Sequence, residues 1–361
     1  MRTDDAAVAQ RRVLRLAFGT AGCLCFSQAI GWPMSYISAV LAMTMLSLPL
    51  PRPSLKTSAL AMLAVIVPIY ASIWLLLPAL LHYRAAGLLL LLLVLFHAFH
   101  FTARGGAALV GTLITISVTL TLAVGSVSVD AVLGVAAGLS AGAIVGVLFV
   151  WMAHALLPDP PSSLPSAAAP PAPADAQEAL RCAVRSVAVV MPIIVWFMLS
   201  VASIGAIPVL IKVAAMGQES GLQGTRLAAR SLIASTLIGG SGAVIAWQIL
   251  SIWPSLPLYT LLVILAGLLM GPRIFEGRGL HPQAPTWSYG FLTMIVILAP
   301  AALDGQLGSA AGAAFMSRLL MFAGATLYAV AAVYVFDAFW PARATTHRDV
   351  TAPQGAGSGG V

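Results

Sequence analysis

Lys212 is the residue of this chain that points most directly to chemistry, because it lies inside an apolar run at 203–216. An ammonium group at the centre of a bilayer costs on the order of 3 kcal/mol on insertion scales, so it needs compensation. It would suit the role of a counter-charge for an anionic substrate. Alternatively, its four methylene groups allow the ammonium group to reach water at the nearby cytoplasmic end of the run. The sequence leaves both interpretations open.

His97 and His100 share one face of the apolar run 85–101, because they lie three positions apart. Histidine titrates near physiological pH, so the pair is a candidate proton relay. Packing at the membrane surface beside Arg104 is the alternative. Two histidines without a third ligand do not indicate a metal site, and the three cysteines have no ligand-type spacing. We therefore expect no metal and no cofactor.

Hydroxyl side chains recur at helical spacing in two apolar runs. Thr115 and Thr119 lie in one of them, and Tyr289 and Thr293 lie in the other. Such stripes could border a path for a solute, although hydrogen bonds between helices explain them as well. Tyr36, in the short second run, is a further candidate. The candidate substrate-pathway residues are Tyr36, Thr115, Thr119, Lys212, Tyr289 and Thr293.

No catalytic constellation is present, and a Gly-rich phosphate loop followed by Lys and Ser or Thr is missing. The sequence thus argues against an enzyme and against ATP hydrolysis by this chain. The net charge of +7 does not indicate nucleic-acid binding, because Lys and Arg are spread over short loops.

The composition predicts a membrane protein. Hydrophobic residues make up 60% and charged residues 8% of the 361 positions, and the mean hydropathy is +0.99. Soluble domains carry about 25% charged residues. Runs of roughly 17–25 apolar residues recur along the chain and are long enough to cross a bilayer as helices. We expect an all-α polytopic membrane protein with about twelve transmembrane helices.

A Pro/Ala-rich stretch at 158–180 divides the chain into two hydrophobic halves. Its proline density excludes a helix interior and is typical of a semi-rigid linker. We expect a first six-helix repeat at 1–157, a cytoplasmic linker at 158–180, a second repeat at 181–341 and a disordered tail at 342–361.

The two halves match piecewise. Arg15 and Arg185 each begin a half, while the segments starting at His154 and Asp337 each end one with a proline four positions later. With an even number of spans per copy, the repeats are expected to be parallel rather than inverted. Gly134, Gly138 and Gly142 at a spacing of four predict close helix packing.

The distribution of positive charge predicts that both termini lie in the cytoplasm. In a twelve-span arrangement nearly every Lys and Arg falls on the side of the termini, and only Arg84 and Arg318 fall on the other side. The second run, 34–48, and the eighth, 203–216, are short and associated with proline. Paired short segments often mark a substrate site, although short tilted helices in a thin bilayer are the alternative.

These features resemble the fusaric acid resistance family, which includes bacterial aromatic acid exporters. The resemblance is carried by Arg15, by Pro49 and Pro51 after a short second span, and by the segments 230–240 and 287–293. It implies a bacterial inner-membrane efflux transporter that is proton-coupled and works with a periplasmic membrane-fusion adaptor. This chain departs from larger members because a short linker stands where they have sizeable cytoplasmic domains.

We therefore expect export of small organic anions, aromatic or amphipathic in character. A passive organic-anion channel and a non-transporting membrane scaffold of an envelope complex are the alternatives. A coupled exporter needs a titrating group in the path, a channel needs only fixed positive charge, and a scaffold needs neither. The sequence does not reveal the substrate, or whether the chain forms a homo-oligomer.

Overall fold

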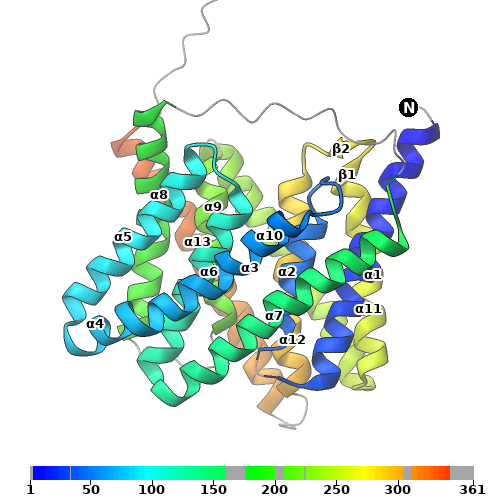
Figure 1. The fold of residues 1–361 in the computed structure, drawn as a ribbon, viewed down its shortest axis with the longest axis horizontal. Helices are drawn as coiled ribbons and strands as arrows, with labels where there is room; N and C mark the ends of the chain where they lie inside the picture. The colour runs from blue at the N-terminus through cyan, green and yellow to red at the C-terminus, as the bar shows by residue number, and fades with distance from the viewer. Residues whose placement is uncertain are drawn as a thin grey trace, which may run out of the picture.

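The computed structural model describes residues 3–32, 34–159, 175–199, 207–222, 225–304 and 310–341, and these are almost entirely helical (Figure 1). The helices of the first half are α1 Thr3–Ile30, α2 Tyr36–Leu46, α3 Leu55–Ala71, α4 Leu77–His82, α5 Arg84–Ala103, α6 Ala108–Val127 and α7 Val129–Leu156. Those of the second half are α8 Ala176–Leu199, α9 Ile207–Leu222, α10 Thr225–Ile252, α11 Leu256–Met270, α12 Ala284–Asp304 and α13 Ala310–Phe339.

Nine helices among the described residues are long and apolar enough to cross a bilayer. One of them joins α3 to α4 through a π-helix, η1 Ser72–Leu76, which lies just before Pro78. Proline lacks the amide hydrogen that an α-helix needs, which favours such a local widening. Many large apolar side chains are exposed on these helices, as expected of a surface that faces lipid. The chain is an all-α, multi-pass membrane protein.

Two helix boundaries and one loop differ from the sequence-based expectation. Helix α8 begins at Ala176, inside the range assigned to the linker. Helix α9 continues to Leu222, past the expected end at Met216. The loop before α12 contains a short 3-10 turn, η4 Gly271–Arg273, and a two-stranded hairpin of β1 Phe275–Glu276 and β2 Gly279–Leu280.

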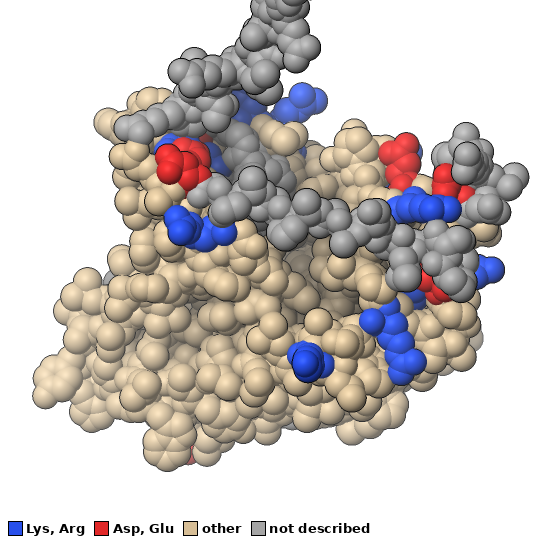
Figure 2. All heavy atoms as spheres, turned by 45° about the horizontal axis from the view of Figure 1, so that its top comes forward, with Lys and Arg blue, Asp and Glu red and all other residues tan. Residues whose placement is uncertain are grey.

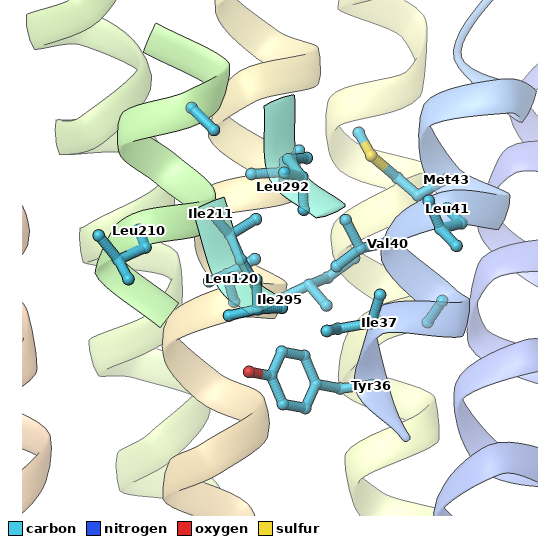
Figure 3. Close-up of a cluster of buried hydrophobic side chains, with 14 of the residues drawn as sticks. Tyr36, Ile37, Val40, Leu41, Met43, Leu120, Leu210, Ile211, Leu292 and Ile295 are labelled. Carbon is cyan, nitrogen blue, oxygen red and sulfur yellow. The ribbon is translucent and has the colours of Figure 1, made fainter. Parts of the chain in front are cut away.

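Helices α2, α6, α9 and α12 form the centre of the bundle. All but two of the 11 residues of α2 are buried. Where these helices meet, apolar side chains fill the space, and Figure 3 shows residues of all four pointing into one cluster. We call this the central apolar cluster; it includes Ile37, Val40, Leu120, Ile211, Leu292 and Ile295.

The helices of the two halves pack in matching pairs. In the first half, α1 contacts α2 and α7, and α3 contacts α6 and α7. In the second half, α8 contacts α9 and α13, and α10 contacts α12 and α13. Between the halves, α1 packs on α11 and α5 packs on α8, while α2 packs on α12 and α6 on α9.

Charged side chains gather at one end of the bundle. Arg12 donates from Nη1 to the carbonyl oxygen of Arg278 at 2.7 Å, and Arg278 Nε bonds Asp5 Oδ1 at 2.8 Å, which joins the start of α1 to the β hairpin. Figure 2 shows Lys and Arg on the part of the surface that carries this end, whereas the lower surface is almost free of charge. We call it the arginine-rich end.

Buried arginines form ion pairs that hold helix ends together at the arginine-rich end. Arg15 Nη1 lies 3.1 Å from Asp159 Oδ2, just beyond the end of α7. Arg185 Nη1 lies 2.8 Å from Asp337 Oδ2 near the end of α13, and Arg181 pairs with the other oxygen of Asp337. Both arginines that begin a half, Arg15 and Arg185, are therefore paired with a carboxylate close to the end of the same half.

Candidate functional site

Lys212 lies in the interior of the bundle. Its helix, α9, is surrounded by α5, α6, α8, α10, α12 and α13. The side chain is 0% exposed, and its Nζ donates to Ser235 Oγ of α10 at 3.3 Å. Nζ also lies 5.8 Å from the centre of the Tyr289 ring of α12, which is within the range of a cation–π contact. The structure thus places the ammonium group among helices rather than at the membrane surface.

The Ser235 hydroxyl is oriented to accept a hydrogen bond from the ammonium group. Its hydroxyl donates to the carbonyl oxygen of Leu232 at 3.1 Å, which leaves its oxygen lone pairs for Lys212. Because Ser235 is also 0% exposed, protein groups take the place of water around this cation. Compensation of this kind is what a charge in the membrane interior requires.

The α10 and α12 helices that flank Lys212 approach each other very closely. A Cβ atom on Gly239 would lie only 2.4 Å from the carbonyl oxygen of Gly290 and 2.6 Å from Cβ of Thr293. Nearer the start of both helices, Ser231 of α10 and Thr286 of α12 share a hydrogen bond of 3.0 Å between their hydroxyl groups. The segments 230–240 and 287–293, which were singled out separately in the sequence, therefore form one helix–helix seam.

Tyr289 and Thr293 lie on the same side of this seam. Thr293 is 0% exposed and donates from Oγ1 to the carbonyl oxygen of Tyr289 at 2.6 Å. Together with Lys212 and Ser235 they make up what we call the Lys212 cluster. Three of the six predicted pathway residues, Lys212, Tyr289 and Thr293, are thus brought together.

The other three pathway residues lie in the first half. Thr115 of α6 is buried and donates to the carbonyl oxygen of Gly111 at 2.8 Å. Thr119 is also buried, and its hydroxyl has no hydrogen-bond partner among the described residues. Tyr36 begins α2, and Figure 3 shows its ring at the edge of the central apolar cluster. Since α6 packs on α9, and α2 on α12, these residues belong to the same central layer as Lys212.

The predicted proton-relay residues lie elsewhere. His97 is exposed on α5, and its Nδ1 bonds the carbonyl oxygen of Leu93 at 2.8 Å within the same helix. The His97 and His100 rings both pack against Phe96, with centroids 5.6 and 5.7 Å away. This arrangement matches ordinary surface packing, and a relay through these residues stays a prediction.

Arg318 is a buried cation that the sequence analysis used only as a topology signal. Arg318 of α13 is 7% exposed and lies close enough to Tyr36 to interact with it electrostatically. Tyr259 of α11 is buried next to Tyr36, and its hydroxyl has no hydrogen-bond partner among the described residues. The sequence could have indicated its burial, because Arg318 interrupts an apolar run as Lys212 does. Nothing in the sequence links Tyr259 to Tyr36.

Residues 12–153 match the sequence model of a family described as "Protein of unknown function (DUF2955)". The match begins in α1 and ends in α7, so it covers most of the first half of the chain. No curated protein and no solved structure shows significant similarity to the chain. The Lys212 cluster lies outside the matched residues, and its function has to be inferred from its own geometry.

Proposed function

We propose that this protein is an inner-membrane transporter that exports small organic anions and binds them at the Lys212 cluster. The observation that carries the proposal is a fully buried ammonium group, held by Ser235 and Tyr289 in the central layer of a membrane helix bundle. Ionisable groups inside a membrane are rare because they are costly, and they commonly mark substrate or ion pathways. An ammonium group beside an aromatic ring suits a carboxylate attached to an apolar or aromatic body.

The central apolar cluster supports the same proposal. Ile211 belongs to this cluster and is the immediate neighbour of Lys212 in α9, so a buried charge borders an apolar barrier. In a transporter such a barrier separates the two sides until helices move apart, and apolar constrictions also close channels by excluding water. The helices that carry the barrier, α2 and α6 against α9 and α12, come from opposite halves of the chain.

We further propose twelve crossings arranged as two parallel six-helix repeats. The matching helix pairs within each half support this arrangement, with α1 corresponding to α8, α2 to α9, the α3–α4 span to α10, α5 to α11, α6 to α12 and α7 to α13. The reciprocal contacts between halves, α1 with α11 and α5 with α8, agree with a two-fold relation. Under this correspondence the short helices α2 and α9 occupy equivalent central places, as a site between repeats requires.

The arginine-rich end is proposed to face the cytoplasm of a bacterium, which follows the positive-inside rule. Cysteines introduced at Ser166 and Ser128, in a variant without the three native cysteines, should then react with a membrane-impermeant reagent from opposite sides. Labelling of Ser166→Cys only from inside and of Ser128→Cys only from outside is expected. Labelling of both from one side would contradict the twelve-span arrangement.

Uptake into inverted membrane vesicles tests the proposed activity. With a panel of labelled aromatic and aliphatic carboxylates, vesicles containing the protein should accumulate at least one acid, and a protonophore should abolish accumulation. An adaptor in the periplasm would carry the acid onward in the cell, but it is not needed for this step. If every acid enters control vesicles equally fast, the proposed transport is wrong.

A passive anion channel is the second candidate. His97 and His100 lie on α5, away from the Lys212 cluster. This favours a channel, because a channel needs fixed positive charge in its path but no titrating relay. The same vesicles separate the two candidates. A channel would let the acid equilibrate whether or not the protonophore is present, whereas a coupled exporter would concentrate it only with a proton gradient.

A further inference from the structure

A large cavity lies in the first half, away from the Lys212 cluster. Its volume is about 620 Å³, which falls in the range of ligand-binding pockets. It is formed where the loop 47–54 meets α3, the start of α6 and the end of α7. Its lining is mostly apolar, and it includes Leu60, an exposed residue on the outer surface of α3. The cavity therefore borders the part of the surface that faces lipid, at the level where the membrane helices end.

One side of the cavity carries positive charge. Arg52 belongs to the lining, and its guanidinium lies 4.5 Å from the centre of the Trp151 ring. The Trp151 indole nitrogen donates to Ser58 Oγ at 2.9 Å, which fixes the ring on which Arg52 rests. No carboxylate among the described residues pairs with Arg52. The guanidinium is thus positioned but still able to bind an anion.

Two helices begin at the same cavity. Ser54 caps α3 and Ala107 precedes α6, and both residues line the cavity. Ala107 has no side chain that can cap α6, so the first amide groups of this helix have no side-chain acceptor. Helix starts carry partial positive charge and are suited to bind phosphate.

His154 provides a further polar group in the lining. The ring is 7% exposed, and its Nδ1 bonds the carbonyl oxygen of Val150 at 2.8 Å, so Nδ1 carries the hydrogen. Its Nε2 makes no hydrogen bond of normal geometry among the described residues, although the backbone of Leu50 lies beside the ring. A hydroxyl group of a ligand headgroup could form a hydrogen bond with this nitrogen after a small movement of the loop.

We infer that this cavity is a binding site for an anionic phospholipid of the cytoplasmic leaflet. The apolar part of the cavity suits an acyl chain, while Arg52 and the start of α6 suit the phosphate and His154 suits a headgroup hydroxyl. The position of the cavity, at the lipid-facing surface and at the ends of the helices, favours a lipid over a transported solute. The arginine-rich end, to which Arg52 belongs, is also where an anionic membrane surface attracts basic groups.

Lipid binding to the delipidated, purified full-length chain tests this site without any transport measurement. Phosphatidylglycerol should bind and raise the melting temperature of the parent, and phosphatidylcholine with the same chains should do so much less. Arg52→Gln should weaken the apparent affinity for phosphatidylglycerol about fivefold, the effect of one basic group near an anionic surface. Ala108→Phe, which fills the cavity from an exposed position, should reduce binding further.

Arg226→Gln is the matched control, because Arg226 is an exposed arginine at the start of α10 in the other half. It should bind phosphatidylglycerol like the parent, and Arg52→Lys should retain most of the affinity. Equal binding of the two lipids, or parental affinity in both Arg52→Gln and Ala108→Phe, would overturn the assignment. So would displacement of phosphatidylglycerol by an aromatic carboxylate at the same site, since the cavity would then hold a solute. Because binding is measured in detergent, its failure is distinct from a failure of transport.

Discussion

Lys212→Met should lower the initial rate of anion uptake into inverted vesicles by roughly ten- to a hundredfold. Methionine keeps the length of the side chain but removes the charged donor. A hydrogen bond to a charged group contributes about 1.5–3 kcal/mol, and each 1.4 kcal/mol is about tenfold in affinity. The amount of protein in the membrane should be equal or higher, because the cost of inserting a cation is removed. Both quantities are measured in the same vesicle preparation.

Lys56 offers a matched control, because it is the other lysine of the chain and lies exposed in the first turn of α3. Lys56→Met makes the same chemical change and should leave uptake unchanged. Lys212→Arg keeps the charge but alters its shape and hydrogen-bond geometry, so partial uptake is expected. Parental uptake by Lys212→Met at parental abundance would rule out a role for Lys212 in binding.

Gly239→Ala should destabilise the protein by about 1–3 kcal/mol, the usual cost of overpacking a tight interior. Its new Cβ would lie 2.4 Å from the carbonyl oxygen of Gly290, which is backbone and cannot turn aside as a side chain could. The α10 and α12 helices would have to separate, and this would also disturb Ser235 and Tyr289 around Lys212. The expected result is a lower melting temperature in detergent and a lower yield from the membrane.

Gly134→Ala and Gly324→Ala are the controls for this substitution. A Cβ at either position would meet nothing within 4 Å, and alanine favours a helix over glycine by roughly 1 kcal/mol. Both variants should be as stable as the parent or slightly more stable. If Gly239→Ala melted together with them, the close contact between α10 and α12 would not exist in the protein.

Much of the architecture follows from the spacing of apolar residues. The long apolar run that follows Pro53 is found as a continuous helical segment at 55–82. The Gly spacing in α7 was only partly informative. Gly142 does pack closely, since its Cβ would lie 3.4 Å from the backbone nitrogen of Ser38, but Gly134 faces open space. Spacing identifies a face of a helix, and it does not identify what lies opposite.

The surroundings of Lys212 could not be inferred from the sequence because they depend on a helix boundary and on a distant contact. The apolar run around Lys212 is expected to end at Met216, yet the structure continues α9 to Leu222. Lys212 is therefore in the middle of a helix instead of near its end. Its acceptor, Ser235, lies on another helix, and only the packing of α9 against α10 brings the two together.

The cavity beside Arg52 was inaccessible to sequence reasoning for a similar reason. Its lining comes from the loop 47–54, from α3, from the start of α6 and from the end of α7, with further residues from α2. Each segment is unremarkable by itself. In the sequence, Arg52 is interpreted as a topology signal and His154 as a packed side chain. Only their common position around one cavity suggests binding.

Transport by the purified protein in liposomes is the most direct test of the central claim that organic anions bind at Lys212 on their way across the membrane. With an imposed proton gradient, the parent and Lys56→Met should take up a labelled aromatic carboxylate saturably. Lys212→Met, reconstituted in equal amount, should show at most about a tenth of that rate, the loss expected for one charged hydrogen bond. Saturable uptake at the same rate by all three proteins would contradict the claim.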